Sequence, residues 1–166
     1  QWIHITVTAE EGSADGFKLY IDGVLENAGS TIGITFADAD ITGDIRFGDM
    51  DNSYKVEGAL DDISFWDHVL TQREITELYT FRLENHPDLV GYWKLDGDGV
   101  DSANSNDGTI VGSANWDDGW TGESLHNSIL LGSPPYLVVP TSADLEVTGD
   151  LTLTAWVKMD TANSWR

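Results

Sequence analysis

Short runs in which apolar and polar residues alternate occur along most of the chain, and this period of two is typical of half-buried β-strands. Residues 2 to 8 read WIHITVT, so Ile3, Ile5 and Val7 share one face and polar side chains take the other. A second alternating run, FKLYI, leads into Asp22 and Gly23, where glycine supplies the positive φ of a tight hairpin turn. By the same reasoning we predict further strands at residues 32–36, 45–47, 58–66, 89–95, 109–112, 136–140 and 151–159.

One segment has the period of an α-helix instead. Thr71 and Glu74 have the spacing of a capping box, in which each side chain satisfies the other's backbone N–H. Ile75, Leu78 and Tyr79 follow at helical spacing. Many short strands separated by turns, with one short helix, predict an all-β fold of the antiparallel β-sandwich type.

Composition narrows the partners and the setting. The 166 residues include 29 acidic and 8 basic side chains, a formal net charge of −21. This charge repels phosphates and anionic lipids, so we expect neither nucleic acid nor membrane insertion. No cysteine is present, which excludes disulfides and thiolate metal sites and favours a microbial surface protein over a vertebrate secreted module. The sequence shows no signal-peptide pattern and begins at Gln1, as expected of a piece of a longer polypeptide.

Several longer motifs resemble one known family. LVGYWKLDGD at residues 89–98, DSANSNDGTIVG at 101–112 and WDDGWTGESL at 116–125 are similar to the opening part of laminin G-like jelly rolls. WIHITVT, KLYIDGV, GALDDISFW and LTQREITELY are similar to the closing part of the same domains. The resemblance places the chain in the concanavalin A-like lectin/glucanase superfamily, and it implies an antiparallel jelly-roll β-sandwich that acts as an extracellular binding module.

The order of these motifs departs from the family. We expect residues 1–80 to be the closing half of a laminin G-like sandwich, 81–88 a linker, and 89–166 an opening half. The chain is then a cut from a tandem array, a circular permutant, or an incomplete sandwich completed by a neighbouring copy. We rank the tandem array first. A half sandwich alone exposes an apolar sheet face and unpaired strand edges, so assembly into a filament or array is an alternative function.

Calcium is the cofactor that the acidic loops favour, because it binds six to eight carboxylate, amide and carbonyl oxygens. The family resemblance implies that Asp61 or Asp62 also contributes to this calcium site. The alternative is that these residues form Asx-turns that shape the loop without a metal. The loop candidates are Asp96, Asp98, Asp101, Asn104, Asn106 and Asp107.

Aromatic side chains offer a second kind of site, because a tryptophan face can stack on a sugar ring. Trp116 and Trp120 flank two aspartates and a glycine, and we expect one of them to contact glycan or a surface protein. The alternative is packing, the commoner fate of a large aromatic residue. We interpret Trp66 and Trp93 as core residues and expect Trp156 to face away from the core.

No catalytic arrangement is present in the sequence. Asp61 and Asp62 are adjacent on a predicted strand and should point to opposite faces, so they cannot act on one glycosidic bond. The four histidines lack metal-site spacing, and no nucleophile elbow or phosphate loop occurs. We therefore expect a non-enzymatic, extracellular or cell-surface module for adhesion or binding, from a repetitive protein. An accessory domain of a carbohydrate-active enzyme is the remaining alternative.

Overall fold

The computed structural model describes residues 1–35, 43–50, 54–55, 58–81, 86–127 and 135–160. Within these ranges the chain forms strands and one helix, α1 (Gln72–Thr80). The strands are β1 (Trp2–Ala9), β2 (Phe17–Ile21), β3 (Val24–Gly29), β4 (Ile45–Phe47), β5 (Asp49–Met50), β6 (Tyr54–Lys55), β7 (Gly58–Trp66), β8 (Leu89–Trp93), β9 (Thr109–Val111), β10 (Asn115–Asp118), β11 (Glu123–Asn127), β12 (Tyr136–Val139) and β13 (Leu151–Met159).

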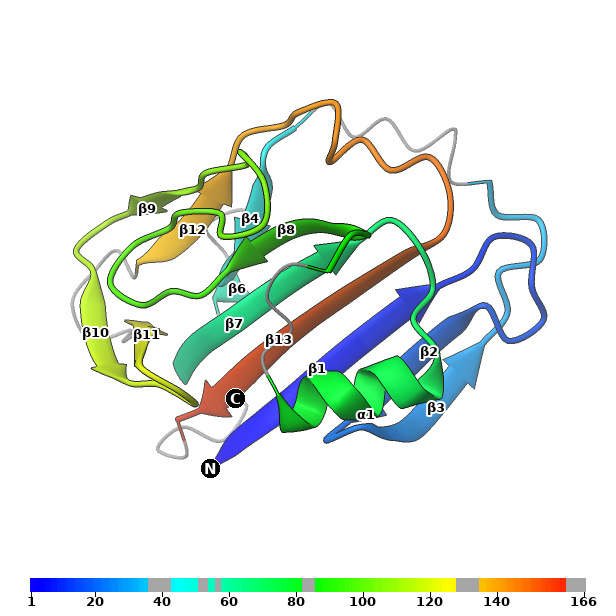
Figure 1. Ribbon diagram of the computed structural model, residues 1–166, viewed down its shortest axis with the longest axis horizontal. Helices are drawn as coiled ribbons and strands as arrows, with labels where there is room; N and C mark the ends of the chain where they lie inside the picture. Colours follow the sequence, from blue (N-terminus) through cyan, green and yellow to red (C-terminus); the bar gives the residue numbers. More distant parts are fainter. Residues whose placement is uncertain (36–42, 51–53, 56–57, 82–85, 128–134, 161–166) are drawn as a thin grey trace.

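Most strands join one large antiparallel sheet with the order β10-β11-β7-β13-β1-β2-β3, and β8 pairs with the far part of β7. A smaller sheet, β4-β12-β9, packs against it, and β5 and β6 form a short ribbon. In Figure 1 the small sheet lies beside β7 and β8, whereas α1 lies across β1 and β2. This arrangement is the concanavalin A-like β-sandwich with one short helix that the sequence predicts.

Strands from the two ends of the chain pair directly. All eight residues of β1 pair with β13, from Trp2 opposite Lys158 to Ala9 opposite Leu151. β7 pairs with β8, β11 and β13, and β4 pairs with β12 (Figure 1). Residues 1–81 and 86–160 thus share both sheets within one chain. A permuted domain and the junction of two tandem repeats both stay predictions.

Two clusters of buried side chains lie on the two faces of the large sheet. The larger cluster fills the space between the sheets and includes Ile63, Trp93 and Leu137, each fully buried. The second cluster packs between the large sheet and α1, around Trp66 and Ile75. The prediction that Trp66 and Trp93 are core residues is confirmed.

On β1 the polar side chains are buried more deeply than the apolar ones. His4, Thr6 and Thr8 are almost fully buried, and the His4 ring lies 6.2 Å from that of Tyr79 on α1. The apolar residues between them are only partly buried. The small sheet of the described residues has three strands, so it does not cover the whole apolar face of the large one.

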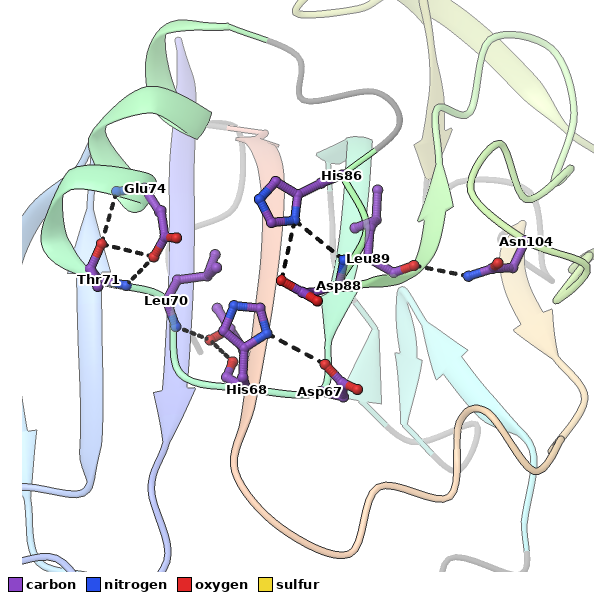
Figure 2. Close-up of polar contacts among 10 residues, drawn as sticks. Asp67, His68, Leu70, Thr71, Glu74, His86, Asp88, Leu89 and Asn104 are labelled. Carbon is purple, nitrogen blue, oxygen red and sulfur yellow. Dashed lines mark hydrogen bonds and ion pairs between the residues drawn. The ribbon is translucent and has the colours of Figure 1, made fainter.

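α1 begins with the predicted capping box. The Glu74 backbone N–H donates to Thr71 Oγ1, and the Thr71 backbone N–H donates to Glu74 Oε2 at 2.7 Å (Figure 2). The hydrogen bonds that the Thr71 backbone N–H and hydroxyl donate to the Glu74 carboxylate lower its pKa. Gln72 anchors the helix to the β2–β3 turn by donating to the Gly23 carbonyl. No helix in the described part of the chain is long and apolar enough to cross a membrane.

Other local predictions have mixed outcomes. Asp22 and Gly23 form the β2–β3 turn with φ of 49° and 77°, as predicted. The strand predicted at 32–36 is wrong over its described residues, because 31–35 form a turn that leaves Ile32 68% and Ile34 48% exposed. Alternation without a partner strand does not make a strand, and the predicted Phe36 lies outside the described residues. Most of the linker, 82–85, does as well.

Candidate ligand-binding site

The loop after β8 is organised by the carboxylate of Asp101. This buried side chain accepts hydrogen bonds from the backbone N–H groups of Tyr92, Ala103 and Asn106, at 2.9, 2.9 and 3.0 Å. Asp107 accepts from the Asp101 backbone N–H at 2.9 Å. The carboxylate therefore fixes both the strand and the loop that follows it.

Two asparagines complete this network. Asn104 donates to the Leu89 and Val90 carbonyls at 2.9 Å, the first of which Figure 2 shows. Asn106 donates to the Val90 carbonyl and accepts from Ser142 Oγ at 2.6 Å. These amides bind backbone groups that would otherwise be unsatisfied beside the core. The loop keeps its shape through hydrogen bonds of the Asx type.

The predicted calcium ligands divide between two places. Asp101, Asn104, Asn106 and Asp107 tie the loop to β8, and the exposed Asp98 accepts from the Val100 backbone N–H. The other three candidates gather at the β10–β11 turn, as described below. Among the described residues, no three acidic or histidine side chains converge as a metal site. Calcium binding stays a prediction that the hydrogen bonds of the loop do not require.

Three carboxylates lie beside the β10–β11 turn. Asp61 Oδ2 accepts from the Trp120 backbone N–H at 2.7 Å, and the Thr121 hydroxyl donates to Asp62 Oδ2 at 3.5 Å. A Cβ placed on Gly122 would lie 2.1 Å from Asp96 Oδ1, so this glycine leaves room for the third carboxylate. Asp61, Asp62 and Asp96 therefore all contact residues 120–122.

Strict alternation predicts that the adjacent Asp61 and Asp62 point to opposite faces, and this prediction is wrong. Asp62 has a φ of 47°, and the β7–β13 register shifts between Thr154 and Trp156. This irregularity turns both carboxylates toward the same turn. Asp61 also accepts from the Asp62 backbone N–H, while Asp62 Oδ1 accepts from the Tyr92 hydroxyl at 2.6 Å. Both side chains are almost fully buried.

Aromatic rings stack beside these carboxylates. The ring centroids of Trp120 and Trp156 are 3.8 Å apart at an interplanar angle of 15°. Tyr79 stacks on Trp156 at 5.6 Å, and His4 lies 5.1 Å from the same indole. Trp156 is 4% exposed, whereas Trp120 is 40% exposed. The stack therefore presents the exposed Trp120 on the buried ring of Trp156.

A cleft opens next to this stack, between α1 and the large sheet. It holds about 330 Å³ of space, a figure that includes open solvent, so the cleft is a shallow one. Its aromatic and apolar wall consists of Leu78, Phe81, Tyr92, Trp120 and Trp156. Its polar wall consists of His4, Asp62, Ser64 and Thr154.

His4 is the polar group of the cleft that lacks a partner. The side chain is 2% exposed, and its Nδ1 has no hydrogen-bond partner. Burial lowers the pKa of His4 to about 4, against the opposing effect of the nearby Asp22 carboxylate. The imidazole is therefore neutral at pH 7. An unsatisfied buried nitrogen is costly, so its presence beside a cleft points to a missing partner.

The two predicted ligand-binding tryptophans have different surroundings. Trp120 lines the cleft, whereas Trp116 is partly buried and packs against the cluster between the sheets. Trp156 faces away from that cluster, as expected. Its ring is nevertheless buried, because Trp120 stacks on it. Sequence reasoning did not single out His4, Ser64, Tyr92 or Thr154 as cleft residues. The available signal was the row of polar residues at alternate positions of β1 and β13. Polar side chains on a covered face of a sheet need hydrogen-bond partners.

Comparison with known families and proteins gives one match. The family model described as Concanavalin A-like lectin/glucanases superfamily, of laminin G type, matches residues 1–76. That range holds β1 and β7, which contribute His4, Asp62 and Ser64 to the cleft, whereas the other lining residues lie beyond it. No curated protein sequence and no solved structure matches the chain.

Proposed function

The chain is laminin G-like and has the concanavalin A-like sandwich fold, and from this premise we propose that it is a non-catalytic glycan-binding module of an extracellular surface protein. Laminin G-like domains are generally binding modules. The observation that carries the proposal is the exposed Trp120, stacked on buried Trp156 at the mouth of a cleft with a polar wall. An immobilised aromatic face binds the C–H face of a sugar at low entropic cost, and hydroxyl and carboxylate groups bind its hydroxyls.

The paired carboxylates support binding rather than hydrolysis. Asp61 accepts from the backbone N–H groups of Asp62 and Trp120, so its carboxylate holds the turn in place. Asp62 is hydrogen-bonded to the Tyr92 hydroxyl. We assign Asp61 the role of positioning Trp120, and Asp62 the role of a polar wall of the cleft.

Affinity measurements on two variants test this function. Trp120→Ala should weaken binding to an oligosaccharide found by screening a glycan array, measured by isothermal titration calorimetry. Phe17→Ala is the matched control, because Phe17 is 45% exposed and lies outside the cleft lining. Equal affinities for the two variants would contradict the proposal.

Assembly through the large sheet is a second candidate function. Of the ten large apolar residues that are exposed in the described ranges, five lie between residues 17 and 34, at the β2–β3 end of the sheet. Strand β3 is an edge strand, and edges with exposed apolar side chains pair with other chains. The five residues are Phe17, Val24, Leu25, Ile32 and Ile34.

Light scattering across a concentration series tests assembly. A mass that rises with concentration, and falls when Val24→Lys places a charge on the edge, supports it. A monomer at every concentration would contradict it. The same series with calcium and then with chelator tests whether a metal takes part.

A further inference from the structure

The surface that the cleft offers to a ligand is apolar. Two of its lining residues are exposed, Phe81 at 67% and Trp120 at 40%, and Leu78 is partly buried. Every other lining residue is at most 5% exposed. A ligand in the cleft therefore makes most of its contacts with these three side chains.

Most polar side chains beneath this surface are hydrogen-bonded within the protein. The Ser64 and Thr154 hydroxyls bond each other at 2.6 Å, and the Trp66 indole N–H donates to Ser64 Oγ at 2.8 Å. The Tyr92 hydroxyl donates to Asp62. These groups have partners without a ligand, so the selectivity of the cleft comes mainly from its exposed apolar side chains.

The two exposed aromatic side chains come from separate elements. Phe81 caps the C-terminus of α1, where its backbone N–H donates to the Glu77 carbonyl at 2.8 Å. Trp120 belongs to the turn between β10 and β11. In the large sheet, β7 and β13 separate β11 from β1, over which α1 lies, so the two rings reach the cleft from opposite directions (Figure 1).

A sugar ring that lies between two aromatic side chains needs a C–H surface on both of its faces. A pyranose whose substituents are all equatorial has such faces, because its oxygens lie around the rim of the ring. An axial oxygen projects from one face instead. Pressed against an aromatic ring, it would lose its hydrogen bond to water without gaining another, which weakens binding.

We propose that Phe81 is the second aromatic contact of the glycan site and a specificity-determining residue, and that the cleft selects pyranoses with only equatorial substituents. The inference rests on the proposed glycan-binding function and names its ligand class. One sugar ring lies between Trp120 and Phe81. Its equatorial hydroxyls stay at the rim, in water or beside the polar wall.

The first experiment compares β-linked hexasaccharides of equal length by calorimetry. Cellohexaose and xylohexaose have only equatorial substituents, whereas mannohexaose and galactohexaose carry one axial oxygen on each ring. We expect cellohexaose or xylohexaose to bind about tenfold more tightly than either axial probe, because only the axial probes bury an unpaired oxygen.

Substitutions of Phe81 test its role as a contact. Phe81→Ala should weaken binding of the best probe by about tenfold and narrow its preference over mannohexaose, whereas Phe81→Trp should retain both. The melting temperature should change little, since the ring is 67% exposed and the cap is made by the backbone. Phe17→Ala is the matched control, because Phe17 is 45% exposed and lies outside the cleft lining.

A double variant tests whether both aromatic residues hold the same ring. If they do, Phe81→Ala combined with Trp120→Ala should lose less affinity than the product of the two single losses, because either substitution alone already frees one face of the ring. Single losses that multiply would overturn the shared ring.

The remaining outcomes are distinguishable. Wild-type affinity in Phe81→Ala would overturn the assignment of Phe81. An axial probe that binds as tightly as the equatorial ones, or a glycan on the array that binds while both equatorial probes do not, would overturn the selection of ring shape and leave the glycan-binding function in place. Failure of every glycan on the array to bind would overturn the proposed function itself.

Discussion

Two acidic regions lie on either side of Tyr92 and use their carboxylates differently. In the loop after β8, the Asp101 carboxylate is saturated by backbone N–H groups, one of them from Tyr92. In the cleft, the Tyr92 hydroxyl donates to Asp62, beside an exposed tryptophan and an unsatisfied histidine nitrogen. In the first region the polar groups bind the backbone and hold the loop in place. The second region places an exposed tryptophan beside buried polar groups.

This difference separates stability from binding. A substitution in the loop should destabilise the fold and leave ligand affinity intact in the molecules that remain folded. A substitution in the cleft should change affinity and leave stability nearly unchanged. The following substitutions test that separation, from the largest expected effect to the smallest.

Asp101→Ala should have the largest effect. It leaves three backbone N–H groups without their acceptor, and we expect a loss of about 4 kcal/mol in the free energy of unfolding. Urea denaturation followed by tryptophan fluorescence measures this loss. Repeating it with calcium and with chelator tests the metal prediction as well. If the loss disappears in chelator, calcium and not hydrogen bonding holds the loop.

His4 should make stability depend on pH. Its pKa is 6.5 in the unfolded chain and about 4 when folded, so between these values only the unfolded state takes up the proton. Stability is therefore fully present above pH 6.5 and falls as the pH drops, by about 3 kcal/mol near pH 4. Denaturation curves of the wild type and His4→Phe from pH 7.5 to 4 measure the difference, and other titrating groups cancel between them. Parallel profiles would contradict the burial of a neutral His4.

Trp120→Ala should weaken glycan binding by about 10- to 100-fold, an effect of about 2 kcal/mol, because it removes the stacking surface. The melting temperature should change little, since the side chain is already 40% exposed. Calorimetric titration and thermal unfolding of the same sample check both halves of this statement. A large loss of stability with unchanged affinity would mean that Trp120 stabilises the fold and does not bind the ligand.

Asp98→Ala should have the smallest effect. This carboxylate is exposed and accepts from the Val100 backbone N–H, so we expect less than about 0.5 kcal/mol of destabilisation. Asp98 is the matched control for Asp101, because both are aspartates of the same loop. Comparable losses for the two would mean that the acidic character of the loop, and not the Asp101 hydrogen bonds, sets its stability.

The sequence was sufficient for the fold, the helix and most of the strands, because these elements have local signatures; β10 and β11 were not predicted. The alternation in β1 and β13, the glycine turn after Asp22 and the Thr71 capping box are local features. The segment around Ile32 shows where such reasoning ends. Its alternation is real, yet no neighbouring strand pairs with the described part of it.

The cleft could be predicted only in part, because it depends on contacts between residues far apart in sequence. Trp120 stacks on Trp156 across 36 positions, and the Asp61 carboxylate meets the Trp120 backbone across 59. The positive φ of Asp62, which turns both aspartates toward one side, arises where the β7–β13 register shifts. A single sequence records neither the pairing nor the shift. Composition showed that aspartates and tryptophans are abundant, but not which of them meet.

The central claim is that the Trp120–Trp156 stack forms the ligand surface, and indole N–H resonances report on it directly. In a ¹H–¹⁵N spectrum the chain has seven indole signals, assigned by single Trp→Phe variants. Titration with the oligosaccharide that binds best should shift the signals of Trp120 and Trp156 and leave those of the fully buried Trp66 and Trp93 in place. Shifts confined to tryptophans outside the stack, with Trp120 unmoved at saturation, would contradict the account.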